Sequence, residues 1–172
     1  MNALGRRAPS VIAHRPMTVS DLDQVMAIET AAYPFPWSRG HFTDSLAAGY
    51  LAELRVFGRE LLGYSVAMAG VEELHLLNIT VAPAHQGQGH ARALLARLGE
   101  VGRAQNAAQI WLEVRESNAR ARRLYEQWGF EAVGLRKGYY PAPHGEREHA
   151  VVMRWALDGG GIAGSGAGHD VD

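Results

Sequence analysis

The chain has 172 residues, which predicts one domain, and its 17 basic against 18 acidic residues are too balanced for binding nucleic acid through bulk charge. The absence of cysteine excludes a disulfide framework, a thiolate zinc site and a cysteine nucleophile. No apolar run approaches the roughly 20 residues of a membrane span, and no apolar signal segment follows Arg6 and Arg7, so we expect a soluble cytoplasmic protein without a membrane or direct nucleic-acid partner.

The two ends of the chain differ in composition from the middle. Residues 1–13 show no clear periodicity, and residues 158–172 are rich in glycine. A glycine-rich stretch offers few apolar side chains to offset the entropy lost on ordering. We therefore expect a flexible segment over 1–13, one folded domain over 14–157 and a disordered tail over 158–172.

The first half of the chain predicts two helices followed by three strands. Ser20 is placed to cap a helix that ends near Pro34, and Ser38 to cap a short helix through Leu46. The strands are expected over 50–57, 61–68 and 74–81, with one more strand near 11–16 ahead of the helices.

The second half predicts an alternation of helix and strand. Five apolar residues share one helical face: Ala91, Leu94, Leu95, Leu98 and Val101. A strand over 109–114 follows, and then a helix that Asn118 opens and Gly129 ends. Strands over 130–135 and 149–155 complete the pattern, which predicts a single α/β domain with helical crossovers.

The segment Gln86-Gly87-Gln88-Gly89-His90-Ala91 joins a predicted strand to a predicted helix. Glycine lets backbone N–H groups approach one point, and the helix adds the positive end of its dipole. The pattern predicts a pyrophosphate cradle, with an ordinary glycine-rich turn as the alternative. The segment lacks the lysine of a P-loop and the third glycine of a dinucleotide fingerprint, which disfavours NTP hydrolysis and NAD binding.

The same segment resembles the acyl-CoA signature of the GNAT superfamily of N-acetyltransferases, (Gln/Arg)-x-x-Gly-x-(Gly/Ala), with Gln86, Gly89 and Ala91 at its defining positions. The resemblance runs from about residue 17 to 157, and it is strongest to the bacterial branch that acetylates a ribosomal protein's N-terminus. The further motifs are Phe35-Pro36-Trp37-Ser38, Leu77-Asn78-Ile79-Thr80-Val81, Trp111-Leu112-Glu113-Val114-Arg115, Leu124-Tyr125-Glu126 and Tyr139-Tyr140-Pro141. The resemblance implies a GNAT fold, a mixed twisted sheet with splayed central strands flanked by helices.

The resemblance also implies acetyl-CoA as the co-substrate, with no metal. In GNAT folds the pantetheine arm of CoA lies beside a splayed strand, a role that falls here on Ile79, Thr80 and Val81. The pyrophosphate is expected on Gly87, Gln88, Gly89, His90, Ala91 and Arg92. Asn118 is expected to contact the cofactor, and its alternative role is that of a helix cap alone.

The resemblance further implies direct attack of an amine on the thioester in a ternary complex, with Glu113 as general base and Tyr125 hydrogen-bonding the departing sulfur. A mid-strand carboxylate needs a partner, so the alternative for Glu113 is a salt bridge, with Arg115 as one candidate. The alternative for Tyr125 is a core tyrosine. The residues Trp37, Tyr139 and Tyr140 are expected to flank the peptide, or else to form an apolar lid over the core.

The expected acceptor is a protein α-amine, most narrowly that of the N-terminal alanine of small-subunit ribosomal protein eighteen. An α-amine has a pKa of about 7.7–8.0 against about 10.4 for lysine, so a base removes its proton at a lower free-energy cost. The alternatives are a GNAT enzyme that acetylates lysine or a small amine, and a CoA-binding module without catalysis. The histidine pairs 85/90 and 144/149 are five residues apart, off a common helix face, so no metal is expected.

Overall fold

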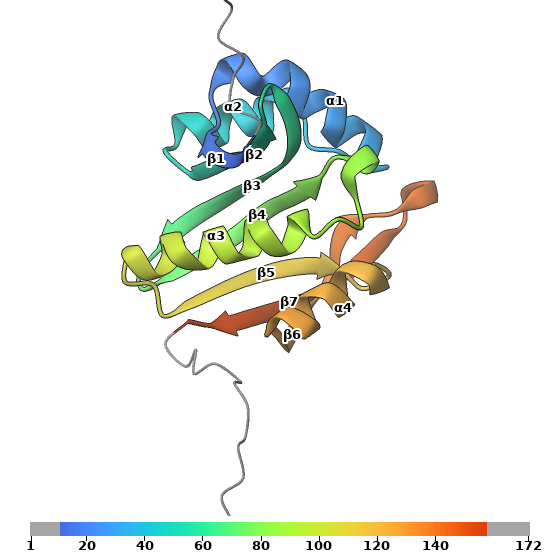
Figure 1. Cartoon of the computed structure of the whole chain (residues 1–172). Helices are drawn as coiled ribbons and strands as arrows, with labels where there is room; N and C mark the ends of the chain where they lie inside the picture. Colours follow the sequence, from blue (N-terminus) through green and yellow to red (C-terminus); the bar gives the residue numbers. More distant parts are fainter. Residues whose placement is uncertain (1–10, 158–172) are drawn as a thin grey trace, which may run out of the picture.

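The computed structural model describes residues 11–157, which form one seven-stranded sheet flanked by four helices (Figure 1). The elements are β1 (Ile12–Pro16), α1 (Leu22–Ala32), α2 (Arg39–Ala47), β2 (Leu51–Phe57), β3 (Glu60–Gly70), β4 (Glu73–Val81), α3 (His90–Ala104), β5 (Gln109–Arg115), α4 (Ala119–Trp128), β6 (Glu131–Pro141) and β7 (Arg147–Ala156). The strand order is β1-β2-β3-β4-β5-β7-β6, and the β4–β5 pair alone is parallel among these neighbours.

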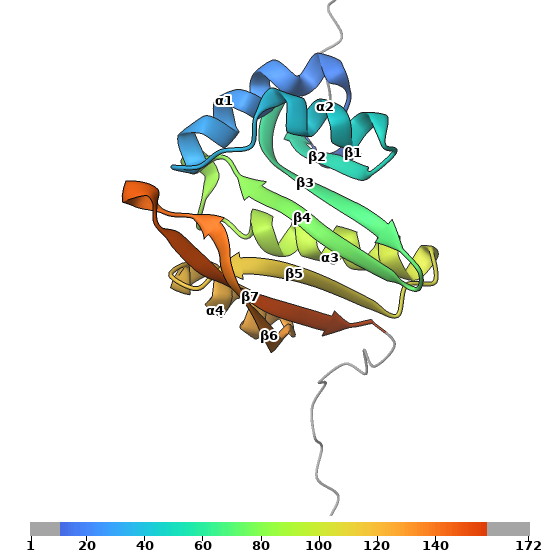
Figure 2. The same ribbon diagram turned by 180° about the vertical axis from the view of Figure 1, so that it is seen from behind.

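Helices cover both faces of the sheet and create two apolar cores. Helices α3 and α4 lie on the near face in Figure 1, and α1 and α2 cover the near face of β2 and β3 in Figure 2. The first core includes Leu95 of α3 and Ile110 of β5. The second includes Val25 of α1, Phe42 of α2 and Tyr64 of β3. Each helix therefore packs its apolar stripe onto one face of the sheet.

Strand β5 presents different chemistry on its two faces because successive side chains of a strand point in opposite directions. The buried set consists of Ile110, Leu112 and Val114, all members of the core beneath α3 and α4. The alternate residues Trp111, Glu113 and Arg115 therefore face the other side of the sheet.

Strands β4 and β5 separate part-way along their length. Their parallel pairing runs from Glu73–Gln109 to Leu76–Leu112, and within residues 11–157 no further pair joins them. On the other side of β4, the register with β3 shifts around Leu77, which is the extra residue of a bulge. Residues 78–81 of β4 therefore pair with β3 alone and leave one backbone edge open.

The predicted order of helices and strands is confirmed, and the additional first strand is present. Ser20 is not the cap of α1: it lies in a 3-10 turn over Val19–Asp21, and Asp21 occupies the cap position. Strand β1 begins at Ile12, so the folded part starts before residue 14. Strands β6 and β7 are longer than expected because their connection lies only at 142–146. Of the two predicted end segments, 1–13 and 158–172, the structure describes only residues 11–13. The expectations for residues 1–10 and 158–172 lie outside the described residues.

Asp21 ties β1 to the start of α1. Its carboxylate accepts hydrogen bonds from Arg15 Nη1 and Nη2 at 2.9 and 2.7 Å, and from the Thr18 backbone N–H at 2.8 Å. The hydrogen-bonded Arg15 guanidinium lowers the pKa of Asp21 to about 2. Because this pKa is below its unfolded value of about 3.9, the contact stabilises the fold above that value and loses its effect as pH falls through 2.

Replacing this carboxylate tests that ion pair. We expect D21N to lower the free energy of unfolding at pH 7 by about 1 kcal/mol, since the half-exposed Arg15 is screened by solvent. Urea unfolding of both proteins at pH 7, 4 and 2 measures the difference, which should shrink towards zero at the lowest pH. A difference independent of pH would contradict the ionic contribution.

Candidate active site

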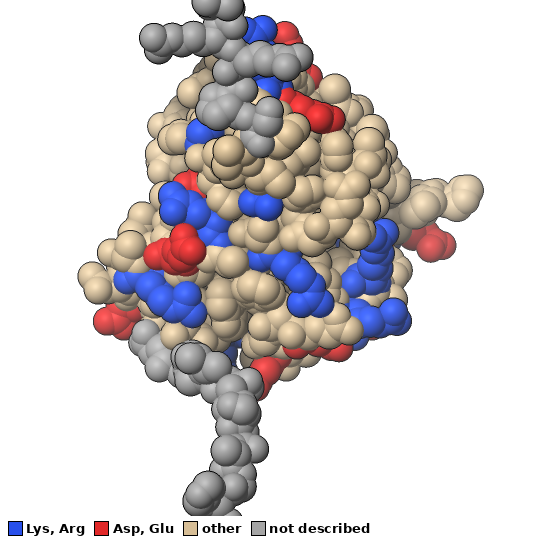
Figure 3. Space-filling model, viewed as in Figure 1, with Lys and Arg blue, Asp and Glu red and all other residues tan. Residues whose placement is uncertain are grey.

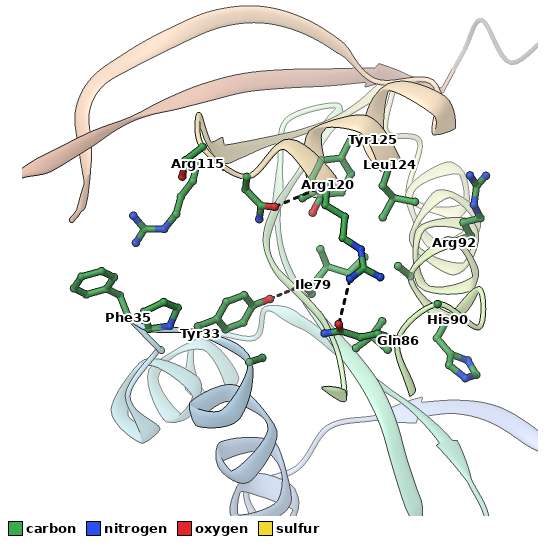
Figure 4. Close-up of a pocket in the computed structure, with 18 of the residues that line it drawn as sticks. Tyr33, Phe35, Ile79, Gln86, His90, Arg92, Arg115, Arg120, Leu124 and Tyr125 are labelled. Atoms are coloured by element: carbon green, nitrogen blue, oxygen red, sulfur yellow. Dashed lines mark hydrogen bonds between the residues drawn. The ribbon is translucent and has the colours of Figure 1, made fainter. Parts of the chain in front are cut away.

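A cavity of about 800 Å³ opens where β4 and β5 separate. Figure 4 shows its walls: Tyr33 and Phe35 come from the segment after α1, Ile79 from β4, and Tyr125 from α4. The segment before α3 closes the remaining side. The open edge of β4 therefore lies beside a space large enough for a long, narrow ligand.

The segment before α3 has the backbone shape of an anion cradle. Gly87 and Gly89 adopt left-handed φ values of 77° and 86°, which favour glycine. Gly89 is the N-cap of α3 and offers no capping side chain, so the first N–H groups of this helix remain available. Arg92 and Arg120 also line the cavity, and they add positive charge beside it.

Basic side chains gather around this mouth. Figure 3 shows them where the start of α3 faces α4. Arg120 Nη1 lies 3.5 Å from Gln86 Oε1, and Arg92 Nη2 donates to Gln127 Oε1 at 3.1 Å. The backbone cradle and these guanidinium groups fit a ligand that carries several phosphates.

The residues of the open β4 edge divide between the two sides of the sheet. Ile79 and Val81 line the cavity, whereas Thr80 is buried and hydrogen-bonds Asn78 Oδ1 at 2.7 Å. The Tyr33 hydroxyl donates to the Ile79 carbonyl at 3.1 Å and lies 2.8 Å from Thr80 Oγ1. Burial raises the pKa of Tyr33 to about 12, so this phenol stays protonated.

Helix α4 supplies two of the predicted residues. The Asn118 side chain accepts a hydrogen bond from the Ala121 N–H at 3.2 Å, and Asn118 also lines the cavity. Tyr125 lines the cavity and is 8% exposed. Burial, with smaller contributions from Tyr33 and Tyr140, raises the pKa of Tyr125 above its ordinary value. Tyr125 is therefore a neutral hydrogen-bond donor at physiological pH.

Glu113 lies outside this cavity lining, although Arg115, the next residue on the same face of β5, belongs to it. Glu113 is the first residue of β5 beyond the last pair with β4, and its side chain is 5% exposed. Its Oε2 is 2.5 Å from His75 Nε2, and its Oε1 is 3.2 Å from Arg136 Nε. Arg115, the candidate partner, instead donates to the Pro141 carbonyl at 2.7 Å and lies 3.4 Å from Glu148.

Aromatic side chains border the Glu113 side of the opening. The Tyr140 hydroxyl donates to the Glu113 carbonyl at 2.9 Å, and the Tyr139 and Tyr140 rings are 4.9 Å apart. The Arg115 guanidinium lies 4.5 Å from the Tyr140 ring and 5.2 Å from the Phe35 ring. Arg115 thus links the segment after α1 to β6.

Trp37 lies elsewhere. Its ring packs 5.1 Å from Phe42 in the core between α1, α2 and the sheet, and Phe35 is the residue of this motif that lines the cavity. The Trp37 backbone N–H donates to Glu29 Oε1 at 3.0 Å. Glu29 is 1% exposed and also accepts hydrogen bonds from Tyr64 and Asn78. This buried carboxylate holds the segment after α1 against β3 and β4.

The predicted residues fall into two groups. The cavity lining includes Ile79, Val81, Gly87, Gly89, His90, Ala91, Arg92, Asn118 and Tyr125. Outside that lining are Trp37, Thr80, Gln88, Glu113, Tyr139 and Tyr140. Sequence reasoning missed Arg136 and Glu29 as neighbours of the site. The alternation of apolar and polar residues over 109–115 indicated that Trp111 and Glu113 share one face of the strand. It could not indicate their partners on β4 and β6.

Two further findings concern the part of the chain that the structure describes. None of its helices has the length and apolar character needed to cross a membrane. Among its histidine, aspartate and glutamate side chains, no group of three is arranged to hold a metal ion.

Comparison with known proteins agrees with this geometry. Residues 22–130 match the acetyltransferase (GNAT) family. The ribosomal protein bS18-alanine N-acetyltransferase of Haemophilus ducreyi is 38% identical over 133 residues, which are 77% of this chain and 92% of the relative. The Escherichia coli K12 protein of the same name is 36% identical over 137 residues, covering 80% of this chain and 92% of the relative.

A solved structure extends the comparison to the fold. The crystal structure of the ribosomal-protein-S18-alanine N-acetyltransferase from Escherichia coli matches with a TM-score of 0.79 and 33% identity. The match covers 94% of this chain and 99% of that one. The expected single domain with splayed central strands is confirmed. The chain therefore belongs to the acetyltransferase (GNAT) family and is an acyltransferase.

Proposed function

We propose that this protein transfers the acetyl group of acetyl-CoA to the α-amine of a protein N-terminus, that of the N-terminal alanine of ribosomal protein bS18. The names of its relatives support this acceptor. The observation that carries the proposal is the opening between β4 and β5, with the glycine-bordered cavity beside it and the Glu113 carboxylate just beyond the last β4–β5 pair. In this role the protein acts in the cytoplasm on a ribosomal protein.

The cavity suits acetyl-CoA in three ways. The left-handed glycines and the α3 N-terminus offer N–H groups to the pyrophosphate. Arg92 and Arg120 offer cationic side chains to the phosphates. The open edge of β4 offers backbone groups to the amide-containing pantetheine arm. When bound, acetyl-CoA supplies the activated thioester.

Glu113 serves as the base in this proposal. It accepts a proton from the acceptor ammonium, directly or through one water, and frees the nitrogen lone pair for attack. An α-amine of pKa about 7.7–8.0 costs only about 1 kcal/mol to deprotonate at pH 7, against about 4.6 kcal/mol for a lysine. A carboxylate base therefore has to supply little free energy to deprotonate an α-amine.

Tyr125 stabilises the departing sulfur in this proposal. A thiol has a pKa of about 8.5, so a thiolate is a weaker base than the phenolate of Tyr125, whose pKa is raised further by burial. Complete proton transfer from Tyr125 is therefore uphill. The phenol acts by donating a hydrogen bond as negative charge develops on the sulfur.

The acceptor side of the opening suits an extended peptide. Phe35, Tyr139 and Tyr140 border it with aromatic surface, and Arg115 lies between two of these rings. Trp37 does not border the opening itself. Its backbone N–H is held by Glu29, and this anchors the segment whose Phe35 ring lines the cavity.

Peptide acetylation tests the proposal. One peptide carries the free N-terminus of bS18, and a second has the same sequence with a blocked α-amine and an internal lysine. Intact-mass spectrometry with acetyl-CoA should show one added acetyl group on the first peptide alone. We expect E113Q to lower kcat/KM by about 10²–10⁴-fold and Y125F by about 10²-fold.

The other outcomes separate the alternatives. Acetylation of the blocked peptide would make the protein a lysine acetyltransferase. No product on either peptide, in a protein that still binds acetyl-CoA, would indicate a small-amine substrate or a non-catalytic CoA-binding module.

A matched pair of glycine substitutions tests the cradle. Gly89 and Gly58 both have positive φ, and nothing lies within 4 Å of a Cβ added at either, so alanine strains the backbone without a collision. We expect G89A and G58A each to lower the unfolding free energy by about 1 kcal/mol. Only G89A should weaken acetyl-CoA binding in calorimetry, by about tenfold, because it re-aims the N–H groups. Equal affinities for the two variants would argue against a cradle in this segment.

A further inference from the structure

Four side chains form a cluster on the acceptor side of the sheet: His75 of β4, Trp111 and Glu113 of β5, and the half-exposed Arg136 of β6. His75 lies directly opposite Trp111 in the parallel register, one pair before the strands separate. The two rings stack with centroids 3.8 Å apart and planes 8° apart. Trp111 therefore fixes the plane of the His75 ring.

The oriented ring reaches the carboxylate of Glu113. His75 Nε2 is 2.5 Å from Oε2, and the two side chains are 12% and 5% exposed. A carboxylate oxygen only accepts, so the ring nitrogen that faces it carries the hydrogen. A hydrogen bond to an ionised carboxylate is stronger than one between neutral groups. This hydrogen bond fixes the χ3 torsion of Glu113, which otherwise samples a broad range of angles.

The second oxygen of Glu113 is left for another partner. Arg136 Nε lies 3.2 Å from Oε1 and completes an ion pair. Within residues 11–157, however, Oε1 accepts no hydrogen bond and is buried, and Trp111 Nε1 on the same face of β5 donates none. Buried polar atoms are rarely left without a partner. The same face of β5 thus holds one buried acceptor and one buried donor that are both available to a bound polar group.

We propose that His75 is a positioning residue for Glu113: its Nε2–H holds Oε2 so that Oε1 faces the acceptor amine. This inference rests on the proposed function, in which Glu113 is the base. As the amine loses its proton, the N–H bond breaks, a bond from that hydrogen to Oε1 forms, and the nitrogen keeps the electron pair. His75 retains its own proton throughout, and the proton on Oε1 later leaves to water.

Arg136 is less suited to this role. Its side chain is 47% exposed, and it lies over the Trp111 and Tyr139 rings at 5.8 and 5.5 Å. A long, half-exposed side chain fixes a partner less firmly than a stacked, buried ring. The geometry therefore assigns the orientation of Glu113 to His75.

Three variants and a double variant test this role in the full chain. H75L removes the donor, H75Q keeps an amide N–H at a similar reach, and H75L/E113Q asks whether His75 acts through Glu113. With the bS18 N-terminal peptide, we expect H75L to lower kcat about 10²-fold while the Kd of acetyl-CoA is unchanged. H75Q should stay within a few fold of wild type, and H75L should cause no further loss in E113Q.

Gln109 provides the matched control on the same pair of strands. Its Nε2 donates to Glu73 Oε2 at 3.1 Å across the closed end of the β4–β5 pair, so Q109L removes a comparable cross-strand contact away from the opening. We expect Q109L to leave kcat unchanged. If circular dichroism shows that H75L does not fold, H75N takes its place in the test. The shorter asparagine amide cannot reach Glu113 Oε2, so H75N should lose activity as H75L would.

Several results would overturn the proposal. These are an unchanged kcat in H75L, an equal loss in H75Q and H75L, or a further loss of the same size when H75L is added to E113Q. A wild-type protein that leaves the bS18 peptide unmodified would overturn the proposed function, and a fully active E113Q would overturn the role of Glu113 as base. Either result would remove the role of His75 with it. Wild-type activity that E113Q abolishes, together with an unchanged H75L, would overturn the role of His75 alone.

Discussion

The site depends on the separation of two neighbouring strands. Parallel pairing between β4 and β5 stops at Leu76 and Leu112, next to a bulge at Leu77. A continuous ladder would satisfy the β4 edge and close the cavity. The interrupted ladder instead leaves backbone groups available to an extended ligand and creates an opening through the sheet. The same interruption places Glu113 at the narrow end of that opening.

The two sides of the opening carry different chemistry. On the side of α3 and α4, helix N–H groups and the side chains of Arg92 and Arg120 favour an anionic ligand. On the other side, a buried carboxylate faces aromatic rings and favours a cationic or amine-bearing partner. Tyr125 stays neutral beside the cavity because burial disfavours its phenolate.

Much of the fold could be predicted from the sequence because its signals are local. Apolar periodicity located α3, and the side chains of Ser38 and Asn118 cap their helices as expected. Ser20 does not cap α1 because a 3-10 turn over Val19–Asp21 precedes the helix, and the Asp21 carboxylate bonds the Thr18 N–H at the start of that turn. Spacing alone did not distinguish this extra turn from the first turn of the helix.

The candidate site was less predictable because its contacts join distant parts of the chain. The partner of Glu113 is His75, 38 residues away, and only the parallel register brings them together. Arg115 points to the same side as Glu113 but bonds the Pro141 carbonyl and approaches Glu148. In the two-proline segment after α1, no periodicity indicates which aromatic ring faces the cavity, and the structure selects Phe35 over Trp37.

A crystal structure with a bisubstrate conjugate, in which CoA is joined through an acetyl bridge to the bS18 N-terminal peptide, tests the central claim most directly. The account predicts the CoA arm along residues 79–81 of β4, its phosphates on the segment before α3, and the peptide nitrogen on the Oε1 side of Glu113. A conjugate bound with its peptide away from Glu113, or with its CoA arm outside the β4–β5 opening, would contradict it.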